Sequence, residues 1–169
     1  NPEQRIDFVE KIRPLREIPP GAAEVLPAIA RTRGGTLDAL RTAVSLVASE
    51  IGCRPSLDIT VDELKEDCYR LTAVIPTLIM ALYRLEADME PIPPHPELGY
   101  SANYLYMRKG VVPDHEHARG VEQYQITTID HGFNASTFAA RVVTSTGADA
   151  GAAVVAGIGA LSGPLHGGA

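Results

Sequence analysis

The chain has 169 residues, of which 45% are apolar and 21% charged. This composition is ordinary for a globular protein in water, and the length fits one domain or a part of a larger one. The formal net charge is −6 and there is no Trp. Both features argue against a nucleic-acid surface, which normally clusters Lys and Arg and stacks bases on aromatic rings.

The two cysteines, Cys53 and Cys68, form no CxxC pair and lie near no histidine at metal-ligand spacing. We interpret them as incidental thiols of a reduced, cytoplasmic protein that binds no metal. The first residues are charged and contain no apolar signal-peptide core. The most apolar stretch, Ala148 to Leu161, is shorter than the ~20 residues that span a bilayer. We therefore expect no membrane segment.

Apolar residues recur at helical spacing through the first half of the chain. The pattern predicts one helix around residues 8–15, a second around 25–29, and a third from Thr36, which can cap it, to Gly52. Thr60 and Glu63 form a capping box that opens a long helix. Pro76 lies inside this helix, and a kink or a break is expected there because proline has no backbone N–H.

In the second half, residues 90–96 are predicted to form an extended linker, followed by a short helix that ends at Gly110. Pro113 suits the first turn of the next helix. Two further helices, about 135–146 and 149–162, are separated by Gly147. Three glycines in the last helix predict close packing and burial. No long segment alternates with period two, so we predict an all-α, multi-helical fold.

Two of the five histidines stand out as candidates for chemistry. His131 and His166 lie at helix boundaries among small residues, in Asp-His-Gly-Phe-Asn-Ala-Ser and Gly-Pro-Leu-His-Gly-Gly. Glycine allows the backbone to approach a ligand closely, and a histidine at a helix end can donate or accept a proton. From spacing alone, a purely structural turn role stays the stronger alternative. We interpret His95, His115 and His117 as solvated surface residues.

Three runs of the chain, residues 95–107, 129–149 and 158–169, together resemble the citrate synthase family of the bacterial type. Their order and spacing match the family, and weaker similarity extends over most of the chain. The resemblance implies that residues 1–169 form a partial large domain of an all-α enzyme that works as a homodimer. The family's N-terminal stretch, small domain and C-terminal part are then absent from this sequence.

The family's reaction joins acetyl-CoA to oxaloacetate and hydrolyses the citryl thioester, a transferase step of the tricarboxylic acid cycle. Acetyl-CoA is a substrate, and the resemblance implies no separate cofactor. His166 matches the catalytic His that hydrogen-bonds the acetyl carbonyl as the methyl group loses its proton. His131 matches a residue that binds oxaloacetate. Ser136 matches the position whose hydroxyl orients the catalytic His, and Asn134 is a neighbour in the same substrate-binding turn.

These roles are physically reasonable. Enolisation needs a hydrogen-bond donor aimed at an oxygen that gains negative charge. A neutral imidazole near a helix N-terminus can be that donor, because the helix dipole disfavours the charged ring. If the last two helices pair in antiparallel fashion, the two histidine turns meet at one end. We then expect the rings of His131 and His166 within roughly 10 Å, since both substrates must meet in one pocket.

The family's second catalytic His, its Asp base and the arginines that clamp oxaloacetate match nothing in residues 1–169. A chain of these residues alone is therefore expected to be inactive. The related 2-methylcitrate synthase, which uses propionyl-CoA, shares both turns and remains an alternative. A third possibility, from a different class, is a non-catalytic helical domain that acts in protein association.

Overall fold

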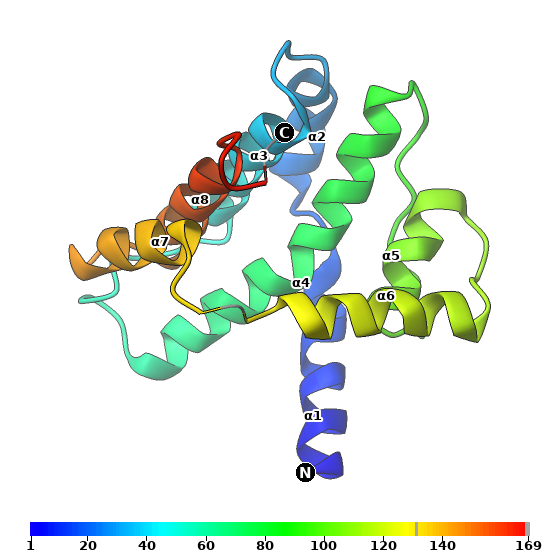
Figure 1. The fold of residues 1–169 in the computed structure, drawn as a ribbon, viewed down its shortest axis with the longest axis horizontal. Coiled ribbons are helices and arrows are strands. Elements are labelled where there is room, and N and C mark those ends of the chain that lie inside the picture. Colours follow the sequence, from blue (N-terminus) through cyan, green and yellow to red (C-terminus); the bar gives the residue numbers. More distant parts are fainter. Residues whose placement is uncertain (131, 168–169) are drawn as a thin grey trace.

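The computed structural model describes residues 1–130 and 132–167. This part of the chain is all helical and contains no strand, which confirms the predicted fold class (Figure 1). The elements are α1 (Pro2–Ile12), the short 3-10 helix η1 (Arg13–Arg16), α2 (Pro20–Ala30), α3 (Thr36–Glu50), α4 (Val61–Glu86), α5 (Tyr100–Lys109), α6 (His115–Thr128), α7 (Ala135–Ser145) and α8 (Ala150–Leu161).

The helices are arranged around α3 and α4. Helix α3 contacts α2, α4 and α8, and α8 in turn contacts α7. Helix α5 contacts α4, and α6 contacts α5. In Figure 1, α7 and α8 lie on one side of α4, α5 and α6 lie on the other side, and α1 extends away from the rest. Among the helices, the α7–α8 pair is therefore joined to the rest of the protein through the contacts of α8 with α3 and α4.

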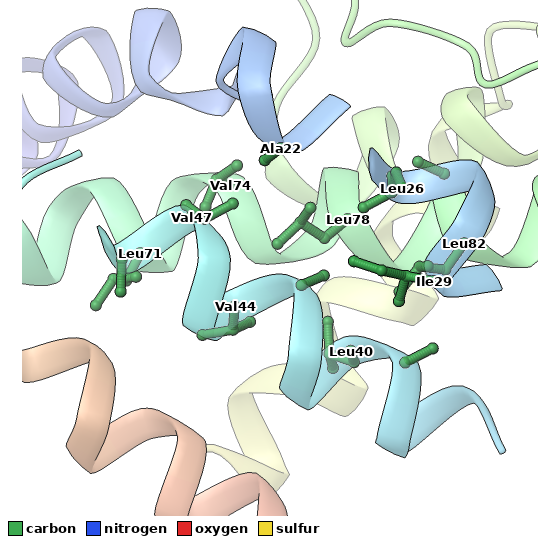
Figure 2. Close-up of a cluster of buried hydrophobic side chains, with 14 of the residues drawn as sticks. Ala22, Leu26, Ile29, Leu40, Val44, Val47, Leu71, Val74, Leu78 and Leu82 are labelled. Atoms are coloured by element: carbon green, nitrogen blue, oxygen red, sulfur yellow. The ribbon is translucent and has the colours of Figure 1, made fainter. Parts of the chain in front are cut away.

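The main hydrophobic core lies between α2, α3 and α4 (Figure 2). Apolar residues at helical spacing place Val44 and Val47 on one face of α3, and Leu71, Leu78 and Leu82 on one face of α4. Each of these side chains is at most 2% exposed. Burying a side chain of this size stabilises a fold by roughly 1.5–3 kcal/mol relative to leaving it in water.

Helix α4 continues through Pro76 and changes direction part-way along its length (Figure 1). Pro76 has no N–H to donate to the carbonyl oxygen of Thr72, four residues earlier. The hydroxyl of Tyr100, at the start of α5, donates to that oxygen at a long 3.4 Å. Of the two predicted outcomes, the structure thus shows a bend and not a break, and a tertiary contact partly replaces the missing bond.

Most helix ends follow the sequence prediction. In the capping box of α4, the Glu63 N–H donates to Thr60 Oγ1 at 3.3 Å and the Thr60 N–H donates to Glu63 Oε2 at 2.8 Å. Asp149 caps α8, because its Oδ1 accepts from the Ala152 N–H at 2.9 Å. Gly110 ends α5 with a φ of 73°, in the left-handed region where glycine is favoured.

Two helix starts differ from the prediction. Gly35, with extended backbone angles, occupies the N-cap of α3, and Thr36 is already the first helical residue. Thr36 does not cap because its own backbone is inside the first turn. Helix α6 begins at His115, two residues after Pro113, and the Asp114 side chain caps it by accepting from the His117 N–H at 2.9 Å. A carboxylate cap explains why the helix starts there.

Helix α8 was predicted to be largely buried, but it is only partly buried. Ala150 and Gly151 are buried, the middle of the helix is half-buried, and Leu161 is 38% exposed. A Cβ atom at Gly151 would lie 2.2 Å from the Ala48 Cβ on α3, so no side chain fits there. At Gly157 the nearest atom would be an ordinary 3.7 Å away, so not every glycine in α8 is needed for close packing.

By length and composition alone, α4 would also qualify as a membrane-crossing helix. Half of its apolar window is buried inside the protein, and the core helix of a soluble protein passes the same test. The core described above accounts for its apolar face. This criterion therefore adds no evidence for a membrane segment within residues 1–130 and 132–167.

Candidate active site at the ends of α7 and α8

A tight turn at Gly147 joins α7 to α8 and sends the chain back along its own path. Gly147 has a φ of 82°, and a Cβ atom there would lie 2.8 Å from Leu57 Cδ1. The two helices contact one another and have similar lengths. The start of α7 and the turn after α8 therefore meet at one end, as the sequence predicted.

The side chain of His166 lies against Ser136, 30 residues earlier in the sequence. Its Nε2 is 3.0 Å from Ser136 Oγ, and it accepts a hydrogen bond from the Ser136 backbone N–H at 3.2 Å. The His166 backbone N–H donates to the Gly163 carbonyl at 2.9 Å and closes the turn. Gly167 follows with a φ of 117°, which side-chain-bearing residues rarely adopt. The predicted contact between Ser136 and His166 is thus present.

The contact with Ser136 assigns the tautomer of His166. A backbone N–H can only donate, so Nε2 must offer its lone pair and the proton of a neutral ring lies on Nδ1. Among the described residues, no group forms a hydrogen bond with Nδ1. Ser136 is the second residue of α7, and the partial positive charge at this helix end gives no stabilisation to a cationic ring. The arrangement presents an Nδ1–H donor to a ligand.

Asn134 is the N-cap of α7 and touches the same site. Its Oδ1 accepts from the Thr137 N–H at 2.9 Å and lies 2.6 Å from Ser136 Oγ. In the preceding turn, the Gly132 N–H donates to Asp130 Oδ1 at 3.0 Å, and Gly132 has a φ of 83°. The structure therefore gives Asn134 a capping role, and its substrate-binding role stays a prediction.

His131, the predicted oxaloacetate-binding residue, lies outside the described residues. The same holds for Gly168 and Ala169. The predicted separation of the His131 and His166 rings therefore stays a prediction.

The other histidines divide into two kinds. His115 and His117 are 83% and 81% exposed, as predicted for surface residues. His95 is half-buried and has a structural role that the sequence analysis missed. Its backbone N–H donates to Asn103 Oδ1 at 3.0 Å, and its ring packs edge-to-face on Tyr106 with centroids 5.2 Å apart. The alternation of Pro around His95 gave no sign of this packing, which depends on α5.

A cluster beside the site also escaped the sequence analysis. The rings of Phe133 and Phe138 meet edge-to-face with centroids 5.6 Å apart, and the Arg141 guanidinium lies 5.3 Å from the Phe133 centroid. Both Phe side chains are more than half exposed. The spacing of three between Phe138 and Arg141 is the one local signal, because residues three apart are neighbours on a helix.

The hollow between α3 and α8 is a separate feature at the Gly147 end of the pair, away from His166. Ser45, Ser49, Cys53 and Asp149 are among the residues that line it. Burial, with the nearby Asp67 and Asp149 carboxylates, raises the pKa of the Cys53 thiol to about 11. The thiol is therefore neutral at pH 7 and is not an activated nucleophile. Within residues 1–130 and 132–167, no group of three His, Cys, Asp or Glu side chains could hold a metal ion.

Comparison with known proteins identifies the family of this chain. The family model described as the citrate synthase C-terminal domain matches residues 1–169. The chain belongs to the citrate synthase family. The citrate synthase of Mycolicibacterium smegmatis is 45% identical over 136 residues, which are 79% of this chain and 35% of that protein. The 2-methylcitrate synthase of Mycobacterium tuberculosis is 44% identical over 133 residues, 79% of this chain and 33% of that protein.

Solved citrate synthase structures share the fold. The enzyme from Pyrobaculum aerophilum matches with a TM-score of 0.79 and 36% identity, over 95% of this chain and 42% of that chain. The enzyme from Thermotoga maritima matches with a TM-score of 0.80 and 31% identity, over 96% of this chain and 40% of that chain. This citrate synthase-family chain therefore spans less than half the length of these relatives.

Proposed function

We propose that this chain carries the acyl-activating part of a citrate synthase site, for the condensation of acetyl-CoA with oxaloacetate to citrate and CoA. One observation carries the proposal. The Ser136 N–H donates to His166 Nε2 at 3.2 Å, and within residues 1–130 and 132–167 no group bonds the Nδ1–H of His166, which can then serve as a donor. A donor held in this way suits the oxygen of a thioester that becomes an enolate.

In the proposed reaction, His166 donates from Nδ1 to the thioester carbonyl oxygen of acetyl-CoA. The methyl group loses its proton to the family's Asp base, which matches none of residues 1–169, and the carbonyl oxygen gains negative charge. Ser136 holds the imidazole in one orientation, so little reorganisation is needed when that charge develops. His131 is proposed to hold oxaloacetate, whose keto carbon the enolate attacks. The thioester of citryl-CoA is then hydrolysed.

A 2-methylcitrate synthase remains the second candidate function. The Mycobacterium tuberculosis enzyme of that name is 44% identical to this chain, which is close to the 45% of the Mycolicibacterium smegmatis citrate synthase. The measurement is kcat/KM for acetyl-CoA against propionyl-CoA, each with oxaloacetate. The citrate synthase assignment predicts a clearly higher kcat/KM for acetyl-CoA than for propionyl-CoA. A higher kcat/KM for propionyl-CoA would reverse the assignment. Membership of an enzyme family argues against a non-catalytic association domain.

The proposal includes a cytoplasmic homodimer that needs no cofactor besides its substrates. No residue of α7 is buried. Phe138 and Val142, two apolar residues one helical turn apart, are 55% and 48% exposed. An apolar helix face of this kind is typical of a surface that a partner covers. Light scattering on a full-length enzyme that contains residues 1–169 should give twice the monomer mass. A monomer at micromolar concentration would contradict this part of the proposal.

The role of His166 is tested with His166→Ala in a full-length enzyme that contains residues 1–169. Turnover, followed by thiol release from acetyl-CoA with oxaloacetate, should fall by about 10²–10⁴-fold. Oxaloacetate binding should weaken much less, because the donor acts on the thioester. His117→Ala is the matched control, since this exposed histidine should leave turnover unchanged. Equal turnover in His166→Ala and wild type would overturn the proposal.

A further inference from the structure

An aromatic contact ties the chain to α7 at the point where it enters the helix. Asn134 is the N-cap of α7, so Phe133 is the residue before the cap and Phe138 is the fourth residue of the helix. Their rings meet edge-to-face, with centroids 5.6 Å apart. An apolar pair at these two positions is a hydrophobic staple, which fixes the angle at which the chain enters a helix. The Arg141 guanidinium, 5.3 Å from the Phe133 centroid, adds a cation–π contact to the same ring.

The turn that precedes Phe133 is closed by bonds of its own. The Gly132 N–H donates to Asp130 Oδ1 at 3.0 Å, and the Asn134 N–H donates to the Gly132 carbonyl at 3.1 Å. Both bonds lie within the segment between α6 and α7, and among the described residues these two helices do not contact one another. The direction of the turn relative to α7 is therefore set where the chain enters the helix, which is where the staple acts.

We propose that Phe133 is a positioning residue for oxaloacetate, which acts through the staple on the turn that carries His131. The inference rests on the oxaloacetate-binding role proposed above for His131. That residue lies outside the described residues, but it is two positions before Phe133 in the sequence, and a chain extends by only about 7 Å over two residues. A Phe133 ring fixed on α7 therefore limits where residue 131 can be. Without the ring, the turn also populates directions that do not bind the substrate.

The staple is expected to affect the binding of oxaloacetate and not the chemical step. When the staple is lost, a smaller fraction of the enzyme has the binding-competent turn, and the apparent affinity for oxaloacetate falls by the same factor. The stabilisation from one aromatic pair corresponds to a factor of about 2–12. The contact between His166 and Ser136 involves neither ring of the staple. Enolisation should therefore proceed normally once oxaloacetate is bound.

The main test is Phe133→Ala in a full-length enzyme that contains residues 1–169. The dissociation constant of oxaloacetate, measured by calorimetry, should rise about 2–12-fold. The value of kcat at saturating oxaloacetate should stay within about twofold of wild type, because only ground-state binding is lost. Phe133→Tyr keeps the ring and should restore the wild-type dissociation constant.

Phe138→Ala tests whether Phe133 acts through the staple. It removes the other ring and should raise the dissociation constant of oxaloacetate to a similar extent as Phe133→Ala. The double variant should be no worse than either single variant, because both remove the same contact. Phe138 also lies on the surface proposed for the dimer, so the titrations are done at a concentration where light scattering gives the wild-type mass.

Phe8→Ala is the matched control. Phe8 and Tyr69 form a second edge-to-face pair, with centroids 5.5 Å apart and with Lys11 Nζ 4.7 Å from the Tyr69 centroid. This pair joins α1 to α4 and not the turn to α7. Its loss should leave both the dissociation constant of oxaloacetate and kcat within about twofold of wild type.

Two results would overturn the inference. One is a Phe133→Ala variant with the wild-type dissociation constant. The other is an increase in Phe133→Ala that Phe138→Ala does not reproduce, which would assign Phe133 to direct contact with the substrate. His131→Ala separates these results from failure of the proposed function. Weaker oxaloacetate binding in His131→Ala but not in Phe133→Ala would overturn only the role of the staple. Unchanged binding in His131→Ala would overturn the proposed role of His131 and this inference with it.

Discussion

The core between α2, α3 and α4 and the site end of the α7–α8 pair are stabilised by different interactions. In the core, Val44 and Leu78 have no exposed surface, and burial of apolar groups has no preferred direction. At the site end, no residue of α7 is buried, and Asn134, Ser136 and His166 are joined by directional hydrogen bonds. Stability and site geometry are therefore separable, and a substitution can damage one while it spares the other.

The largest effect on stability is expected in the core. Leu78→Ala removes a fully buried side chain and leaves a cavity, and it should lower the free energy of unfolding by about 2–5 kcal/mol. Urea unfolding followed by circular dichroism measures the change. Leu57→Ala is the control, because Leu57 is 84% exposed and its loss should cost no more than about 0.5 kcal/mol. Similar losses in the two variants would contradict the assigned core.

The next effect concerns the packing of the site-bearing pair on the core. Gly151→Ala places a Cβ atom 2.2 Å from the Ala48 Cβ, and the clash should cost about 1–3 kcal/mol of unfolding free energy. At Gly159, the nearest atom to an added Cβ would be 3.9 Å away. Gly159→Ala should therefore stabilise the helix by up to about 1 kcal/mol. Thermal unfolding of both variants gives the sign of each change in stability. Destabilisation by Gly159→Ala would show that there is less space at Gly159 than the 3.9 Å separation indicates.

A smaller effect is expected where α3 caps α2. The Glu50 carboxylate accepts from the Gly21 and Ala22 N–H groups, both at 2.7 Å, and the N-cap residue Pro19 supplies no side-chain bond. Glu50→Ala should cost about 1 kcal/mol, as for loss of an N-cap. Hydrogen exchange should speed up at the amides of Gly21 and Ala22. Glu50→Gln, which keeps one oxygen acceptor, should lose less, and equal exchange in all three proteins would refute the cap.

The smallest effect is a pH dependence from the hollow beside the core. The pKa of Cys53 is raised from 9.0 to about 11, mainly by burial, so the fold favours the neutral thiol. Its contribution to stability is complete below pH 9 and is lost as the pH rises through about 11. The thermal unfolding midpoint should therefore decrease as the pH is raised from 9 to about 11, and it should decrease less in Cys53→Ala. Identical pH profiles would exclude this thiol as a cause.

Several features of the candidate site follow from local sequence. The caps at Thr60 and Asp149 act over three residues, and Gly147 makes the turn that pairs α7 with α8. The pairing in turn places Ser136 next to His166. The caps can be predicted because their partners lie within one turn of the chain, and the pairing can be predicted because α7 and α8 have similar lengths on either side of a tight turn.

Other features depend on parts of the chain that the local pattern does not connect. Helix α4 continues past Pro76 with the help of the Tyr100 hydroxyl, 28 residues away from Thr72. Of the glycines in α8, Gly151 is the one against which α3 leaves no space, and sequence alone does not distinguish it from Gly157. The sequence by itself determined the helices, the caps at Thr60 and Asp149, and the pairing of α7 with α8. The tertiary structure decided which groups touch between helices, because steric clearance and hydrogen-bond geometry depend on the relative placement of elements far apart in the chain.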